Sequence, residues 1–398
     1  MKVLAVLPSF YGWTGDAVNE RQLTLALSRC VKSVYVLTLI GLKQLVTRRR
    51  SELKVSVPEN MRVLPLLCPY LPPPLGLFEI VLASYVFGLF AAILRILRIV
   101  DSIYVRNSLL AFGFVSTKNL AKVTVVKLPA LVEDELLPTI GGQLNKVVVK
   151  LCKTADKLVL ANAGRVCVPS EAFRQQLIAR RGLPTRTPIF VISPGVDAKK
   201  IGSMKADDQA VSRSETRIGF IGSLSWWQGV DLLVESMAIV NKQFPEAHLY
   251  IVGGGKMSGM LEQKCRSLKV RYTLTGFIPH EDAVKLLATF YTLVSPGRRT
   301  STTESNIPIK LVEAWALGVP VIVTKHRVLD GKFKDREDLI FCEPEVKDIA
   351  DKILLALKNP EMMNRLAERS ARLAEEFDYE HIASRLSEAL NELKRKTF

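Results

Sequence analysis

The sequence has few of the residues that build metal centres or disulfide frameworks. Its six cysteines are scattered without a CxxC pair or zinc-type spacing, and its four histidines all lie in the second half of the chain. Isolated cysteines of this kind are typical of reduced core thiols in cytoplasmic proteins. We therefore expect no disulfides, no metal site and a cytoplasmic setting.

The chain also shows no internal repeat, no low-complexity tract and no secretory signal. Its apolar start, Lys2–Pro8, has the length of a strand and leads into polar loop residues. At 398 residues the chain is long enough for two cores, so we expect two domains of about 200 residues each.

Charge is unevenly distributed along the chain. Residues 1–205 hold 28 Lys and Arg against 12 Asp and Glu, a net +16, whereas residues 206–398 hold 27 of each. A basic half beside a neutral half suggests two units with different partners. No nucleic-acid recognition motif accompanies the basic residues, so we expect no nucleic-acid partner.

No apolar run is long enough to demand a membrane span. Leu75–Arg98 predicts a helix, but its uninterrupted apolar part, Ile80–Leu94, falls short of the roughly 20 residues that a bilayer requires. A helix buried against a sheet and a helix partly sunk in a membrane interface both fit this pattern. The basic excess of this half favours contact with anionic headgroups.

The first half alternates strands and helices, as an acceptor-binding, Rossmann-like domain over residues 1–200 would. Lys2–Pro8 is followed by a loop with Gly12 and Gly15, where backbone can approach a phosphate or a sugar. After the strand Thr124–Leu128 come three adjacent acids at what would be the ligand-binding edge of the sheet. We expect at least one of them to contact the acceptor: Glu133, Asp134 or Glu135.

The second half restarts the same alternation over residues 215–378, after a polar connection at residues 199–215. Ile218–Gly222, His248–Val252 and Tyr272–Thr275 are predicted strands. The glycines that follow the second strand favour close approach of a phosphate or ribose. Closing helices follow, the last at residues 379–398. The predicted fold class is α/β, with two doubly wound parallel-sheet domains facing a cleft.

The stretch Val294–Thr324 carries the densest pattern in the chain. Pro308–Leu317 predicts a three-turn helix that starts at proline, stops at Gly318 and precedes the buried strand Val319–Val323. Lys310 and Glu313 lie three residues apart and share a helix face. A helix N-terminus behind a polar, basic loop is a site for phosphate, and a carboxylate one turn in can accept hydrogen bonds from a sugar diol.

Taken in order, the motifs resemble those of the retaining glycosyltransferases of family 4, which have the GT-B fold. The resemblance covers residues 160–360 and is carried by Val168–Glu171, Ile192–Asp197, Gly219–Asp231, Ile251–Gly255, Thr275–Pro279 and Pro308–Pro320. The first 150 residues match only in layout. The resemblance implies that the C-terminal helix returns to the N-terminal domain.

The resemblance also implies a role for each matching position. Glu313 would hold the donor ribose, Lys310 and the amides before it would face the diphosphate, and Glu304 would contact the donor sugar as a catalytic residue. Asp134 is the candidate catalytic residue of the acceptor domain. The remaining donor contacts would come from Gly12, Gly15, Ser223, Gln228, Gly254, Gly255, Phe277, Ile278, Arg298, Asn306 and Ile309.

Three departures from the family pattern bear on this reading. Ser223 and Gln228 stand where relatives place an arginine and a lysine on the diphosphate, which weakens charge stabilisation of the leaving group unless Lys310, Arg298 or Arg299 substitutes. Glu304 and Glu313 are nine residues apart instead of eight. No histidine stands in the acceptor domain, and His280 reads as a capping or surface residue.

The resemblance implies retaining transfer of a hexose from a nucleotide sugar, with no metal or other cofactor. The leaving diphosphate would take the acceptor proton, so the protein supplies positioning and charge. We expect a glycan or lipid-linked acceptor in glycan biosynthesis, and peripheral binding to an anionic membrane surface at the inner membrane face. The alternatives are a non-catalytic nucleotide-sugar or membrane-binding partner subunit and a sugar-nucleotide epimerase.

Overall fold

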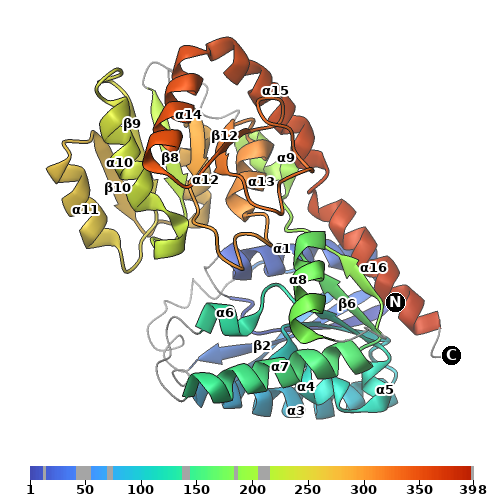
Figure 1. Cartoon of the computed structure of the whole chain (residues 1–398). Coiled ribbons are helices and arrows are strands. Elements are labelled where there is room, and N and C mark those ends of the chain that lie inside the picture. The colour runs from blue at the N-terminus through green and yellow to red at the C-terminus, as the bar shows by residue number, and fades with distance from the viewer. Residues whose placement is uncertain are drawn as a thin grey trace. The chain divides into compact units, whose positions relative to one another are not determined.

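The computed structural model describes residues 1–11, 15–41, 55–69, 75–136, 144–182, 187–204 and 216–395. The chain divides into two compact units, which are described separately. Unit 1 comprises Met1–Ser193 with Tyr379–Phe398, and unit 2 comprises Pro194–Asp378. Each unit is a parallel sheet covered by helices (Figure 1), which confirms the predicted fold class.

Unit 1 contains a seven-stranded parallel sheet in the order β3-β2-β1-β4-β5-β6-β7. Its strands are β1 (Lys2–Leu7), β2 (Ser33–Gly41), β3 (Met61–Cys68), β4 (Ser102–Arg106), β5 (Thr124–Lys127), β6 (Arg165–Val168) and β7 (Ile189–Val191). Its helices are α1 (Gly15–Cys30), α3 (Leu75–Ile96), α4 (Ser108–Val115), α5 (Lys118–Ala121), α6 (Val132–Leu136), α7 (Leu144–Asn162), α8 (Glu171–Arg181) and α16 (Tyr379–Arg395).

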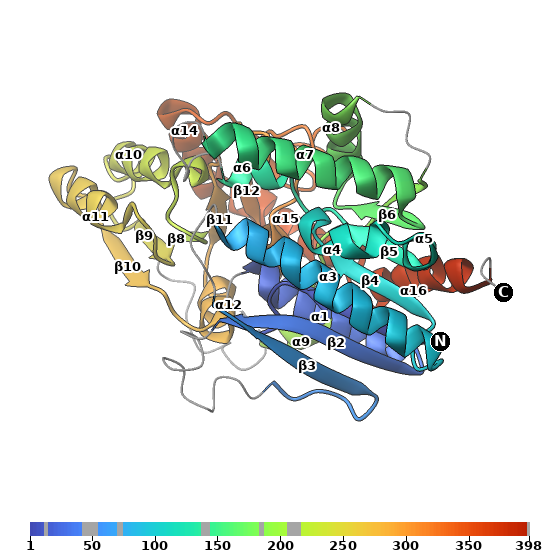
Figure 2. The ribbon, with the colours of Figure 1, turned by 90° about the horizontal axis from the view of Figure 1, so that it is seen from below.

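Side chains of β1 alternate between two apolar layers, as the period of a strand requires. Leu4 and Val6 face the layer formed with α3 and α4, whereas Val3 and Ala5 face the layer formed with α1 and α16. Figure 2 shows α3 lying across unit 1 with α4 beside it. Both faces of the sheet are therefore covered at β1, which is why this central strand is apolar on both sides.

The C-terminal helix α16 packs on unit 1, as expected. Ile382, Leu386 and Leu390 belong to the same apolar layer as α1, and Ser102 Oγ donates to the carbonyl oxygen of Leu390 at 3.1 Å. The chain thus begins and ends in one unit, with unit 2 formed by the residues between.

Unit 2 contains a six-stranded parallel sheet in the order β10-β9-β8-β11-β12-β13. Its strands are β8 (Arg217–Ile221), β9 (His248–Val252), β10 (Tyr272–Gly276), β11 (Thr292–Ser295), β12 (Val321–Thr324) and β13 (Ile340–Cys342). Its helices are α9 (Ala198–Met204), the short 3₁₀ helix η2 (Trp226–Gln228), α10 (Val230–Val240), α11 (Ser258–Ser267), α12 (His280–Ala288), α13 (Ile309–Ala316), α14 (Val346–Lys358) and α15 (Pro360–Glu375).

The polar connection expected at residues 199–215 begins later than predicted. Residues 198–204 form α9 within unit 2, because Ile201 is buried there. Residues 205–215 lie outside the described part of the chain.

Each sheet reverses its direction of growth once. In unit 2 the chain proceeds from β8 outward to β10 and then returns to place β11 on the other side of β8. The loops after β8 and β11 therefore diverge at a switch point on the carboxyl edge of the sheet, where ligands bind in folds of this type.

Candidate functional site

The predicted donor residues of unit 2 come from the loops and helices at this switch point. Gln228 closes η2 in the loop after β8, and Arg298 follows β11. The helix α13 begins where the loop after β11 ends. The fold therefore gathers chain segments 70 to 90 residues apart around the start of α13.

Local sequence fixes the ends of α13. Pro308 is the N-cap, with φ −65° and ψ 134°, one residue before the helix and not at its first position as expected. Gly318 has φ 64°, and the amide of Val319 reaches back to the carbonyl oxygen of Ala314, so the predicted glycine stop is confirmed. The helix ladder starts at the amide of Leu311, which leaves the amides of Ile309 and Lys310 ahead of it.

Lys310 is a buried cation with a neutral partner. Its Nζ donates to Oε1 of Gln228 at 2.8 Å and lies 4.1 Å from the centre of the Phe220 ring. Burial lowers the pKa of Lys310 from 10.5 to about 7. The favourable contacts to Gln228 and Phe220 do not offset the loss of hydration, so an incoming anion would stabilise the charged form.

Glu313 lies on the same face of α13 and pairs with a histidine that the sequence did not assign to the site. Its Oε1 is 2.6 Å from Nε2 of His280, at the first residue of α12. The Glu313 side chain is 11% exposed. His280, whose side chain is 36% exposed, thus orients the carboxylate that is expected to hold a ribose, a role that its expected surface position did not indicate.

Glycines after β9 let two loops at the edge of the sheet pack closely. Gly253 has φ 125°, and a Cβ there would lie 2.0 Å from the carbonyl oxygen of Gly222. A Cβ on Gly254 would meet the ring of Phe277 at 2.7 Å, and one on Gly255 would meet the carbonyl oxygen of Leu224 at 2.6 Å. These glycines are thus explained by packing within the chain, and the expected approach of a donor to Gly254 and Gly255 stays a prediction.

The side chains beside these glycines are open to solvent. Phe277 is 82% exposed, Ser223 is exposed and Ile278 is half-buried. An exposed aromatic ring over a glycine offers a flat apolar surface, and the expected contact of Phe277 and Ile278 with the donor stays a prediction.

Arg298 is committed to contacts within unit 2. Its guanidinium forms two hydrogen bonds with Asp231, at 2.8 and 2.7 Å, and lies 5.1 Å from the ring of Trp226. Burial alone would raise the pKa of Asp231, but the guanidinium outweighs this effect and holds that pKa below its ordinary value. Arg298 therefore clamps η2 to the loop after β11, and its charge is already balanced.

Glu304 and Asn306 lie in the loop before α13. Glu304 accepts from the amide of Arg327 at 3.0 Å and lies 3.2 Å from Nδ1 of the buried His326. Asn306 Oδ1 is buried and has no hydrogen-bond partner among the described residues. Glu304 thus joins two loops, and Asn306 presents a free acceptor two residues before Pro308.

The described site residues that were predicted in unit 1 are not brought together as those of unit 2 are. Asp134 pairs with Arg180 through both carboxylate oxygens, and the neighbouring Glu133 is buried against Arg181. Gly15 is the first residue of α1, and Gly12 lies outside the described residues. The roles of Asp134, Gly12 and Gly15 stay predictions.

Comparison with known proteins identifies unit 2. Residues 205–373 match the family model described as glycosyl transferases, group 1. Unit 2 is a group 1 glycosyltransferase domain. This confirms the resemblance at the level of the group, and the narrower assignment to family 4 stays a prediction.

Relatives of this group 1 domain share modest identity. The alpha-D-kanosaminyltransferase of Streptomyces kanamyceticus is 22% identical over 241 residues, covering 57% of this chain and 60% of that protein. The chain thus spans about three-fifths of that relative's length.

Solved structures match over nearly the whole chain. Sucrose-phosphate synthase from Thermosynechococcus elongatus has a TM-score of 0.79 at 18% identity, covering 100% of both chains. HepE of Anabaena in complex with UDP-glucose has a TM-score of 0.68 at 19% identity, covering 98% of this chain and 100% of that one. These likenesses show the GT-B fold.

Three contributors to the site were missed from the sequence: His280, Asp231 and Trp226. Each acts through a partner at least 33 residues away, so no local spacing indicates it. Among the residues that the structure describes, no group of three or more His, Cys, Asp or Glu side chains is arranged to hold a metal ion.

Proposed function

We propose that the chain transfers a hexose from a nucleotide-sugar donor to a glycan or lipid-linked acceptor, with retention of the anomeric configuration. The donor diphosphate would lie at the start of α13 against Lys310 and the amides of Ile309 and Lys310. Glu313, held by His280, would accept from the ribose hydroxyls, and Phe277 with Ile278 would lie beside the base.

Lys310 carries this proposal. It is a buried cation at a switch point, and its pKa of about 7 reflects burial without compensating charge. A diphosphate supplies that charge, and a lysine with a helix N-terminus is a recurrent way of holding phosphate. The UDP-glucose present in the HepE structure is a ligand of the class proposed here.

We propose that no metal takes part, and that the leaving diphosphate receives the acceptor proton. The protein would then contribute position and charge at the leaving group, through Lys310 and the helix amides. Asn306, whose buried Oδ1 lacks a partner, would accept from a hydroxyl of the donor sugar. Asp134 would contact the acceptor in unit 1.

A panel of nucleotide sugars tests the proposal in two steps. One member should raise the melting temperature of the full chain, and that donor should release its nucleoside diphosphate when acceptor is supplied. The anomeric coupling of the product, measured by NMR, should equal that of the donor. A chain that no nucleotide sugar stabilises would contradict the proposal.

A non-catalytic partner subunit is the second candidate. It is favoured by Ser223 and Gln228, which lack the positive charges of the family pattern, and by Arg298, whose charge is balanced by Asp231. Such a subunit would bind the nucleotide sugar and release no nucleoside diphosphate with any acceptor, so the same experiment separates the two.

A further inference from the structure

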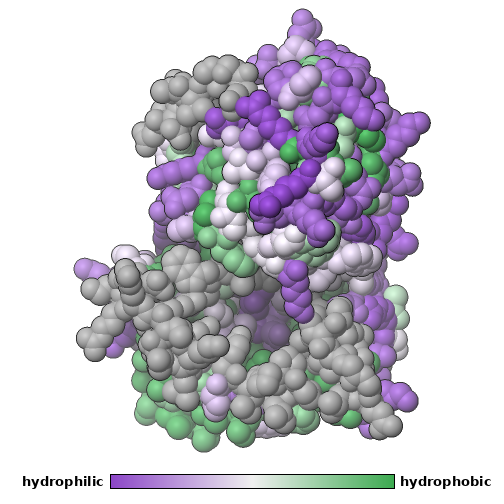
Figure 3. Space-filling model, turned by 90° about the vertical axis from the view of Figure 1, so that its left-hand side faces the viewer, coloured by the Kyte–Doolittle hydropathy of each residue, from purple (hydrophilic) through white to green (hydrophobic). Residues whose placement is uncertain are grey.

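One face of α3 presents an apolar stripe to solvent. Leu82 and Leu89 are each 68% exposed, and Ile96 is 81% exposed. The stripe follows helical spacing over about five turns and comprises Phe78, Leu82, Tyr85, Val86, Leu89, Phe90, Ile93 and Ile96. Figure 3 shows apolar surface gathered along the lower edge of unit 1, where Figure 1 places α3. A soluble surface seldom exposes so many large apolar side chains together.

The opposite face of α3 is fixed to unit 1. Phe87 and Ala91 belong to the apolar layer shared with the sheet, and Gly88 lies against Gly113 of α4. The amide of Gly113 donates to Oγ of Ser84 at 3.0 Å. This packing holds the stripe in place as a permanent feature of the surface.

The fold excludes a span by α3, although the helix is long and apolar enough to cross a membrane. The strands before and after it, β3 and β4, belong to the same sheet. A spanning helix would place those two strands on opposite sides of the bilayer, which one continuous sheet does not permit. Any membrane contact of α3 therefore lies in the plane of the interface.

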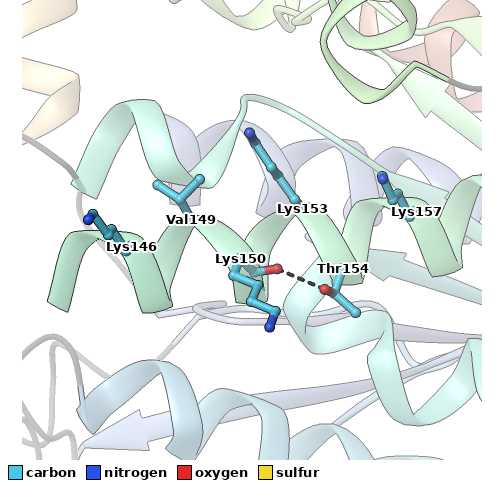
Figure 4. Close-up of a pocket in the computed structure, with 6 residues that line it drawn as sticks. All are labelled: Lys146, Val149, Lys150, Lys153, Thr154 and Lys157. Carbon is cyan, nitrogen blue, oxygen red and sulfur yellow. Dashed lines mark hydrogen bonds between the residues drawn. The ribbon is translucent and has the colours of Figure 1, made fainter. Parts of the chain in front are cut away.

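A row of lysines on α7 accompanies the stripe. The two helices share a small apolar cluster, in which Leu77 of α3 packs with Val148 and Cys152 of α7. On its outer face α7 carries four exposed lysines around a shallow hollow (Figure 4): Lys146, Lys150, Lys153 and Lys157. Asp156, the only acid of α7, is buried against Arg181, so this face has no negative charge of its own.

We propose that α3 and α7 together form a membrane-docking surface for an anionic bilayer. The apolar stripe would enter the interface to the depth of its side chains, and the lysines of α7 would contact the phosphates of the headgroups. Apolar area and positive charge on neighbouring helices match both parts of an anionic lipid surface. The docking surface rests on the proposed function for its biological role, because a lipid-linked acceptor is presented at a membrane.

Vesicle sedimentation of the full chain tests the surface. The wild-type chain should bind vesicles that contain phosphatidylglycerol and bind pure phosphatidylcholine far more weakly. The variant Leu82→Asp/Leu89→Asp should lose binding to both, because charge is costly within the interface. Replacing the four α7 lysines by glutamine should weaken binding to anionic vesicles by about two to three orders of magnitude, since each lysine contributes roughly fivefold.

Matched controls separate docking from folding and from donor binding. Glutamine at four exposed lysines of unit 2 should leave vesicle binding unchanged: Lys242, Lys269, Lys334 and Lys347. All variants should keep the wild-type melting temperature, which reports folding of the full chain, and the wild-type nucleotide affinity, which reports unit 2. Free inorganic phosphate, added in excess, should not displace the chain from vesicles.

Three results would overturn the proposal. The first is a wild-type chain that stays in the supernatant with both vesicle types. The second is a four-lysine α7 variant that binds as the wild type does. The third is self-association through the stripe. In that case the wild-type chain would be a dimer that binds no vesicles, and the Leu82→Asp/Leu89→Asp variant would be a monomer. Loss of nucleotide binding with vesicle binding intact would contradict the proposed function instead.

Discussion

Lys310 is held by burial near the midpoint of its titration at neutral pH. Because its pKa in the folded chain lies below the ordinary value of 10.5, the unfolded chain binds the extra proton between about pH 7 and 10.5. The free energy of unfolding therefore rises with pH through that window, because the cost of burying a charged lysine disappears as the proton is lost. Below the window this cost is present in full. An anion beside Nζ would reverse this preference by favouring the charged form.

Binding of a nucleoside diphosphate should consequently take up protons above pH 7. Affinity should fall by up to about tenfold per pH unit between pH 7 and pH 9, as the free chain loses the proton on Lys310. Titration calorimetry in buffers of different ionisation enthalpy measures both quantities. Lys310→Met should bind more weakly and with a flat profile over this window; the same slope in that variant would place the titrating group elsewhere.

The Glu313–His280 pair predicts selectivity for ribose over deoxyribose. Glu313→Gln should weaken binding of a ribonucleoside diphosphate by about 1–3 kcal/mol and weaken binding of its 2′-deoxy analogue less, because that analogue keeps only the 3′-hydroxyl. His280→Gln should weaken the same discrimination partly, because the carboxylate remains but loses its orienting partner. If both variants kept the wild-type preference, Glu313 would not contact the ribose. The measurement is competitive displacement of a fluorescent nucleotide.

At the scale of elements, the site depends on how closely the loops after β8 and β9 approach. Gly222 donates its amide to the carbonyl oxygen of Val252, and Leu224 donates to that of Gly254. The glycines make this approach possible, since a side chain at Gly253 would occupy the space of the facing backbone. The loops are thus placed by packing before any ligand arrives.

Gly253→Ala should lower the free energy of unfolding by more than about 2 kcal/mol, because a positive φ and a backbone clash combine there. Gly259→Ala is the matched control, since its Cβ would meet nothing within 4 Å. In α11 that alanine should be neutral or add up to about 1 kcal/mol. Chemical denaturation measures both, and equal effects would show that the approach of the loops is unimportant.

The core of the donor site was predictable at the level of elements. The expected helix Pro308–Leu317 is observed as Ile309–Ala316, because proline, glycine and apolar spacing are local features. The predicted strand Val319–Val323 is observed at Val321–Thr324, so it begins two residues later and ends one residue later than predicted. The edge strand β3 gave no clear pattern, since it contains Pro65 and leaves half its positions exposed.

Contacts across the fold were not predictable. His280 and Glu313 meet through packing of α12 and α13, and Arg298 meets Asp231 across 67 residues. The helical period of Leu75–Arg98 predicts α3 but not its environment, because an all-round apolar helix fits a core and an interface equally. Its mostly exposed outer face appears only in the folded unit.

At the scale of the whole molecule, α16 makes unit 1 depend on the end of the chain. Leu386 and Leu390 are fully buried between α1 and the sheet. Unit 1 therefore completes its core only after unit 2 has been synthesised, and the stability of unit 1 should respond to changes in α16.

Leu386→Ala should destabilise unit 1 by about 2–5 kcal/mol, the usual cost of emptying a buried leucine site. Glu388→Ala, on the exposed face of the same helix, should change stability by less than about 0.5 kcal/mol. Calorimetry with and without a nucleoside diphosphate assigns the transitions, because ligand should raise only that of unit 2. A single transition shifted equally by both variants would contradict this picture.

The central claim is that a donor diphosphate binds at the start of α13. Hydrogen exchange of the full chain, with and without saturating nucleoside diphosphate, tests it most directly. The account predicts slower exchange at the amides of Ile309 and Lys310 and in the loop Gly222–Gln228, with no change in α7. Protection confined to other segments, with these amides exchanging as in the free chain, would contradict it.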